Sequence, residues 1–158
     1  MSSIVITLGV MIRTDFEYRE TLKRIEQSEQ AFKDEEIKLK SQGLDRDQIK
    51  RMLDPGRFFC DQIKSEVETY ERLKRGEFDV LHNLIGVGPL LIGARIASGL
   101  SQRELADRLG VHESQVSRDE RNEYHGITVD RAHRILEVLG VDVTTRVERV
   151  SERAVKTA

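Results

Sequence analysis

The most informative part of this sequence is LSQRELADRLGVHESQVSRDE, residues 100–120. Ser101, followed three positions later by Glu104, is a capping box that begins a helix. Gly110 comes where this helix must end, because glycine adopts left-handed dihedral angles at little cost. A second helix follows the turn and points Val116 inward. The stretch therefore predicts two short helices joined by a tight turn.

The flanking sequence predicts one more helix on each side of this pair. Their inward-facing residues are Leu90, Leu91, Ala94 and Ala97 before the pair, and Ala132, Ile135, Leu136 and Leu139 after it. Gly99 and Gly140 end these helices, and Thr128 caps the later one. Residues 88–141 thus supply four short helices, enough to close a small core. Two helices joined by a glycine turn form a helix-turn-helix, whose second helix fits the major groove of DNA.

Three motifs in this region carry a family resemblance: RIASGLSQRELADRLGV (95–111), SQVSR (114–118) and RILEVLGV (134–141). With these motifs the chain resembles the phage Cro and repressor family, the XRE-like helix-turn-helix regulators. The likeness covers about a third of the chain. It implies a four- to five-helix DNA-binding domain and a role in transcription regulation.

The resemblance also assigns side chains to double-stranded DNA. Positions that match the groove-facing side of the second helix are His112, Glu113, Ser114, Gln115 and Arg118. Positions that match phosphate contacts are Ser101, Gln102, Arg121 and Asn122. We expect Arg118 and Gln115 to read bases, because arginine bonds both acceptors of guanine and glutamine can pair with adenine.

Two residues depart from the family pattern. Asp119 stands where the family more often has a large apolar residue, and we expect it to pair with Arg121 or Arg131. Glu113 places a carboxylate near the groove, where it repels phosphate but can accept a hydrogen bond from cytosine. These departures affect the expected DNA affinity and leave the expected fold unchanged.

Charge and composition bound the remaining possibilities. The formal net charge is −2, and the part from residue 85 onward carries 11 basic and 11 acidic residues. Any DNA affinity must therefore come from charges gathered on one face, and dimerisation would double those contacts. The single Cys60 excludes an internal disulfide and is expected to be a packed thiol. No apolar run reaches membrane-spanning length, and residues 3–12 lack the basic start of a signal peptide. We expect a cytoplasmic protein.

The first half of the chain predicts a helical hairpin. A long charged helix spans residues 14–42, with an apolar seam that Glu29 and Glu36 interrupt. A short segment, residues 45–53, precedes a second helix that Asp54 caps and Pro55 opens. The seam residues are Tyr18, Leu22, Ile25, Phe32 and Leu39, and the stripe on the second helix is Phe59, Ile63, Val67 and Tyr70. The hairpin serves either as a spacer and dimerisation arm or as a docking surface for another protein.

Short strands are expected near both termini. Residues 3–12 are rich in β-branched side chains, and residues 141–147 alternate between valine or threonine and polar residues. A two-stranded ribbon is only marginally stable, so we expect these strands to pair with each other or in a dimer.

The sequence offers little support for catalysis or for a cofactor. The four histidines (His82, His112, His125 and His133) lie in separate elements and lack metal-site spacing. Gly86 and Gly88 are interpreted as a hinge, with Pro89 opening the next helix, since no strand precedes them. We predict that the chain is not an enzyme and binds no metal and no cofactor.

These observations predict a mainly α chain with an N-terminal helical hairpin, a C-terminal Cro/repressor-like domain and short terminal strands. The expected divisions are residues 1–80 (dimerisation or partner docking), 86–141 (DNA binding) and 142–158 (strand and tail). The predicted function is that of a homodimeric, sequence-specific repressor. The arrangement around residues 70–111 also resembles HigA-type antitoxins, which implies a toxin partner on residues 14–75 as the alternative.

Overall fold

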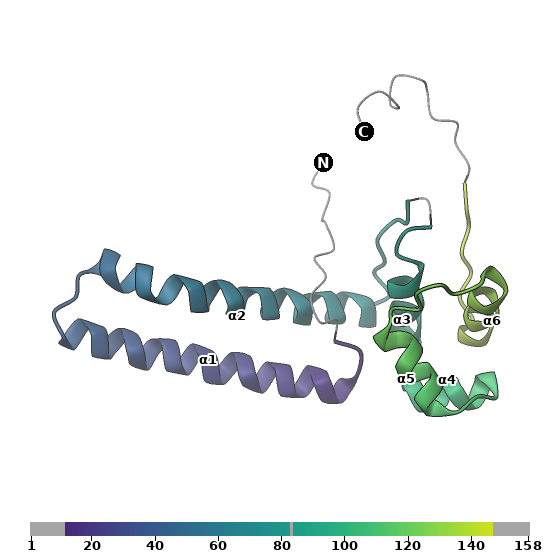
Figure 1. Ribbon diagram of the computed structural model, residues 1–158, viewed down its shortest axis with the longest axis horizontal. Coiled ribbons are helices and arrows are strands. Elements are labelled where there is room, and N and C mark those ends of the chain that lie inside the picture. Colours follow the sequence, from purple (N-terminus) through teal and green to yellow (C-terminus); the bar gives the residue numbers. More distant parts are fainter. Residues whose placement is uncertain (1–11, 83, 147–158) are drawn as a thin grey trace, which may run out of the picture.

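The computed structural model describes residues 12–82 and 84–146, and this part of the chain contains six helices and no strand. α1 (Asp15–Ser41) and α2 (Arg46–Lys74) lie side by side as a long antiparallel pair (Figure 1). A bundle of short helices packs at one end of the pair: α3 (Val87–Ala97), α4 (Gln102–Leu109), α5 (Glu113–Arg121) and α6 (Val129–Leu139). The predicted mainly helical fold is confirmed.

The two glutamates that interrupt the seam of α1 form ion pairs with α2. The Glu29 carboxylate lies 2.7 Å from Lys64 Nζ, and the Glu36 carboxylate accepts from Arg57 Nη2 at 2.9 Å. All four side chains are at least one-third exposed, so these ion pairs contribute little stability. The pair is stabilised chiefly by the apolar seam, in which Leu39 is buried.

α2 continues without a break through Pro55, so the predicted helix start at Asp54 is wrong. Asp45 caps the helix instead, because its carboxylate accepts from the backbone N–H three residues on, at 2.8 Å. Upstream of the proline, Ile49 and Leu53 are buried against α1. Their packing offsets the hydrogen bond that an interior proline removes.

The α1–α2 pair and the bundle share one hydrophobic core. Val67 and Tyr70 of α2 and Ile12, which precedes α1, are buried in the same cluster as Leu91 of α3 and Leu105 of α4. Cys60 of α2 is buried and forms no disulfide, as predicted for a packed thiol. The short helices are therefore held on the long pair by apolar burial as well as by the chain itself.

α3 contacts the loop that follows α5 at a single glycine. A Cβ atom on Gly88 would lie 1.8 Å from the backbone oxygen of Glu123, so only glycine fits there. Glu123 and the buried Tyr124 both have positive φ, 49° and 52°. Pro89 lies in the first turn of α3, as predicted, but Gly88 is a packed helix residue and not the predicted hinge.

The predicted C-terminal strand does not form over residues 141–146, which have no regular secondary structure. Alternating side chains favour a strand only when a neighbouring strand supplies hydrogen bonds, and no such neighbour exists among the described residues. The predicted N-terminal strand lies outside the described residues except for Ile12, which is buried.

Candidate nucleic-acid interface

α4 and α5 form the helix-turn-helix, and local sequence defines where each helix begins and ends. Ser101 Oγ accepts from the N–H of Glu104 at 3.2 Å, and the Glu104 carboxylate accepts from the N–H of Ser101 at 2.8 Å. These bonds hold the pKa of Glu104 below its usual value. Gly110 ends α4 with a φ of +69°. His112 then caps α5, with Nδ1 accepting from the N–H of Ser114 at 3.2 Å.

α5 presents a polar row outward and packs its other side into the bundle. Val116 and Glu120 are buried, with 1% and 0% of their surface exposed. Ser114, Arg118 and Arg121 are exposed and recur at intervals of four and three residues, so they lie on one outer face. The Arg118 side chain has no hydrogen-bond or ion-pair partner within the part of the chain that the structure describes. Its guanidinium is therefore available to a ligand.

A buried ion pair fixes the C-terminal half of α5. Arg95 of α3 binds both carboxylate oxygens of Glu120, with 2.5 Å from Nε to Oε1 and 2.7 Å from Nη2 to Oε2. The same guanidinium donates to the backbone oxygens of Leu100 at 2.7 Å and Arg13 at 2.9 Å. Gln102 Nε2 donates to Glu120 Oε2 at 2.8 Å. This satisfied network anchors the helix that carries Arg118.

The residues predicted to contact phosphate differ in whether their side chains are already hydrogen-bonded within the protein. The Ser101 hydroxyl is engaged in the capping box and donates to Glu104 at 2.7 Å. The Gln102 amide is half-buried and bound to Glu120. Arg121 and Asn122 are exposed at the end of α5. The backbone at the start of α4, the end of α5 and the outer face of α5 are the parts that remain open to a ligand.

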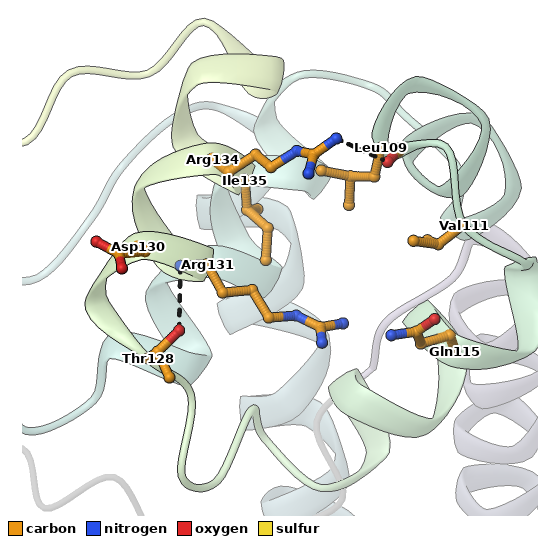
Figure 2. A pocket seen from close by; sticks show the side chains of 8 residues that line it. All are labelled: Leu109, Val111, Gln115, Thr128, Asp130, Arg131, Arg134 and Ile135. Atoms are coloured by element: carbon orange, nitrogen blue, oxygen red, sulfur yellow. Dashed lines mark hydrogen bonds between the residues drawn. The ribbon is translucent and has the colours of Figure 1, made fainter.

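Gln115, one of the two predicted base readers, is bound within the protein. In the amide orientation that satisfies both of its polar atoms, the side-chain oxygen of Gln115 accepts a hydrogen bond from Arg131 Nη2 of α6 at 3.0 Å. Arg131 also forms an ion pair with Asp119, which confirms one of the two partners predicted for that carboxylate. Figure 2 shows the Arg131 side chain extending from α6 toward Gln115. Arg131 of α6 therefore links two side chains of α5, Asp119 and Gln115.

A cleft of about 340 Å³ lies beside these contacts (Figure 2). Leu109 and Ile135 line it with apolar surface, and Arg131 and Arg134 of α6 reach into it. Arg134 donates to the Leu109 carbonyl oxygen at 3.3 Å. From the sequence, Arg131 is expected only as a partner of Asp119, and Arg134 carries no prediction. Both arginines lie on one face of α6, within four residues of Asp130. This position gives no local sequence signal for the cleft.

Helix polarity accounts for the charges on α5. Glu113 is exposed in the first turn, where the positive end of the helix dipole favours a carboxylate. Arg118 and Arg121 lie in the last turn, where the negative end favours cations. The carboxylate that departs from the family pattern thus has a structural role in the first turn, whatever it does toward DNA.

Residues 12–82 and 84–146 contain no group of three or more His, Cys, Asp or Glu side chains arranged to hold a metal ion. Within those ranges no helix is both long enough and apolar enough to cross a membrane.

The arrangement of α4 and α5, with a capped start, a glycine turn and an exposed polar row on the second helix, defines a helix-turn-helix domain. Comparison with known families agrees, because residues 92–145 match a family model described as helix-turn-helix. The matched segment covers about a third of the chain, and its likeness is to helix-turn-helix domains of the XRE-like family. No curated protein and no solved structure matches the chain.

Proposed function

We propose that this chain is a sequence-specific transcriptional repressor that binds an inverted-repeat operator as a homodimer. The observation that carries the proposal is the exposed row Ser114, Arg118 and Arg121 on α5, a helix held in place by the buried Arg95–Glu120 pair. An outward arginine without an internal partner on a rigid helix is what base readout in the major groove requires.

In the proposed complex, α5 lies in the major groove and Arg118 bonds the two acceptors of a guanine. Arg121 and Asn122 lie beside it at the end of the helix, where they bind the flanking phosphates. His112, Glu113 and Ser114 face the neighbouring base edges from the first turn. Gln115 contributes a base contact through its amide nitrogen, because its oxygen is held by Arg131.

Dimerisation supplies the affinity that one domain lacks. The part of the sequence from residue 85 onward carries 11 basic and 11 acidic residues, so a single copy has little general attraction for phosphate. Two copies would place two recognition helices in successive major grooves, about 34–36 Å apart or a multiple of that distance. Occupying the promoter in this way would block transcription. The proposal assigns the chain no catalytic activity and no cofactor.

The experiment that tests this function is fluorescence anisotropy with the full chain and DNA from its own promoter, against scrambled DNA of the same composition. We expect submicromolar binding to the promoter, a clear preference over the scrambled DNA, and a steep loss of affinity as salt is raised. Equal binding to both DNAs, or none to either, would contradict sequence-specific recognition.

The antitoxin alternative has one observation in its favour. The outer face of α1 leaves Phe16 and Ile37 67% exposed, more apolar surface than a spacer needs. Under this alternative a toxin covers the α1–α2 pair and the helix-turn-helix represses the shared operon. Co-purification of a protein encoded next to this gene, lost when both residues are changed to serine, would favour it over the simple repressor.

A further inference from the structure

α2 carries a second stripe on a side that does not face α1. Five positions spaced by three or four residues form it: Arg51, Pro55, the pair Phe58 and Phe59, Gln62, and Glu66. Phe58 is 67% exposed and Phe59 is 58% exposed. The residues that pack against α1, such as Leu53 and Cys60, lie on a different face. The stripe therefore has a basic end, an aromatic centre and an acidic end.

Among the described residues, the two charged side chains that bound this stripe form no direct ion pair, in contrast to the charges on the other edge of the α1–α2 pair. On that other edge Arg57 and Lys64 bind Glu36 and Glu29. In the part of the chain that the structure describes, neither the Arg51 nor the Glu66 side chain forms a hydrogen bond or a direct ion pair, although Arg24 of α1 is close enough to attract the Glu66 carboxylate. Partial burial raises the pKa of the Glu66 carboxyl, and the attraction of Arg24 offsets this rise only in part. An exposed aromatic surface between two opposite charges that lack a direct ion pair fits a partner of matching pattern.

We propose that the partner is a second copy of this chain, with the two α2 helices packed antiparallel. A two-fold axis near Phe58 and Phe59 would bring the aromatic rings of both copies together. The same axis would set Arg51 of each copy opposite Glu66 of the other, so each contact is formed twice. Parallel packing would instead set arginine against arginine and glutamate against glutamate. The charge order along the stripe therefore selects the antiparallel dimer.

This inference deepens the proposed function, since it rests on the homodimer of that proposal and names its surface. The stripe from residue 51 to residue 66 is roughly 22 Å long, the length of a short helix contact. Such a contact suits a dimer of moderate affinity that DNA stabilises further.

The test is charge reversal followed by sedimentation velocity of the full chain without DNA, over a range of protein concentrations. We expect the unaltered chain to dimerise. Arg51→Glu and Glu66→Arg alone should each raise the dissociation constant about tenfold or more, because each sets like charges opposite one another. The double variant should regain the original constant, because the pair is restored with its signs exchanged. Replacing both Phe58 and Phe59 with serine should abolish the dimer.

Matched controls lie on the same helix outside the stripe. Lys50→Glu and Glu68→Arg reverse the same charges at exposed positions next to the tested ones and should leave the dimer unchanged. Circular dichroism of every variant checks that the helices persist. A monomeric unaltered chain, or a double variant no better than the single ones, would overturn the inference. Promoter binding is measured separately, so a monomer that still prefers its promoter would overturn this dimer surface and leave DNA recognition standing.

Discussion

Arg95 and Glu120 meet as a two-bond ion pair at the centre of the bundle, where neither side chain is more than 3% exposed. The pair joins α3 to α5. Removing one member would leave the other charged and buried.

Glu120→Gln should therefore lower the free energy of unfolding by about 3–5 kcal/mol, because Arg95 keeps its charge and loses its counter-ion. Urea denaturation followed by circular dichroism measures this change. Glu137→Gln, at a carboxylate 63% exposed, is the control and should change stability by less than about 0.5 kcal/mol. A loss for Glu120→Gln no larger than that of the control would show that the pair contributes nothing to stability.

Gly88→Ala and Gly56→Ala should differ sharply. At Gly88 the new methyl group would meet the backbone oxygen of Glu123 at 1.8 Å, so α3 or the loop must move, at about 3 kcal/mol or more. At Gly56 the nearest atom belongs to the Phe32 ring, 2.8 Å away, and a ring can turn aside. The helix propensity of alanine offsets that shift, so we expect a change within about 1 kcal/mol. Thermal unfolding of both variants tests the difference, and equal effects would contradict the close contact at Gly88.

Arg118→Ala should weaken binding to the operator by about 1–3 kcal/mol while binding to random DNA stays nearly the same. The reason is that Arg118 is expected to bond a base and not a phosphate. The control is Arg46→Ala. Arg46 is exposed at the start of α2, at the end of the α1–α2 pair away from the bundle, so this variant should bind DNA like the unaltered chain. Anisotropy titrations on both DNAs measure the effect. An equal loss on random DNA would assign Arg118 to a phosphate contact instead.

Arg131→Ala should change base preference at one operator position. It would free the Gln115 amide oxygen, and glutamine needs both amide atoms to pair with adenine. We expect discrimination in favour of adenine at that position to increase, by up to about tenfold. Binding to a set of operators with single base changes measures it. The control is Arg134→Ala, since Arg134 lines the same cleft but bonds only the Leu109 carbonyl oxygen. The base preferences of this variant should match those of the unaltered chain.

Asp15 should make the base of the α1–α2 pair sensitive to acid. Its carboxylate accepts from Lys74 Nζ and from the Tyr70 hydroxyl, both at 2.8 Å, and these bonds hold its pKa below the usual value of 3.8. A lowered folded-state pKa means that the stabilisation is present above about pH 4 and is lost as the pH falls through the lowered value. The stability difference between the unaltered chain and Asp15→Asn should shrink below about pH 4. Asp107→Asn, at an exposed carboxylate on α4, should show no such trend. Urea midpoints from pH 2 to 7 decide the matter.

Local sequence signals predicted the helix-turn-helix well, because its determinants lie within a few residues of one another. Three local features predicted it: the capping box at Ser101, the glycine turn at Gly110 and the inward Val116. Each of them depends only on residues within about one helical turn of itself. The pairing of Asp119 with an arginine was also predicted, because Arg121 and Arg131 lie nearby in the sequence, and Arg131 is the partner found.

The incorrect predictions involve contacts between distant parts of the chain. Pro55 was expected to open a helix, but packing of the preceding turns against α1 carries α2 through it. Residues 141–146 have the alternation of a strand but no neighbour to pair with among the described residues. The bond from Gln102 to Glu120 and that from Arg95 to the Arg13 backbone join residues 18 and 82 positions apart, which no local pattern could indicate.

The reach of the Arg95 guanidinium has a mechanical consequence. It is bonded at once to the backbone just before α1, to the turn between α3 and α4, and to the end of α5. The α1–α2 pair extends roughly 40 Å away from the bundle and is continuous with its core. We therefore expect the pair to act as a lever arm fixed to α5, so that a torque applied at its tip would turn α5 together with the bundle. A partner bound to this arm would then set the angle at which α5 enters the proposed DNA groove.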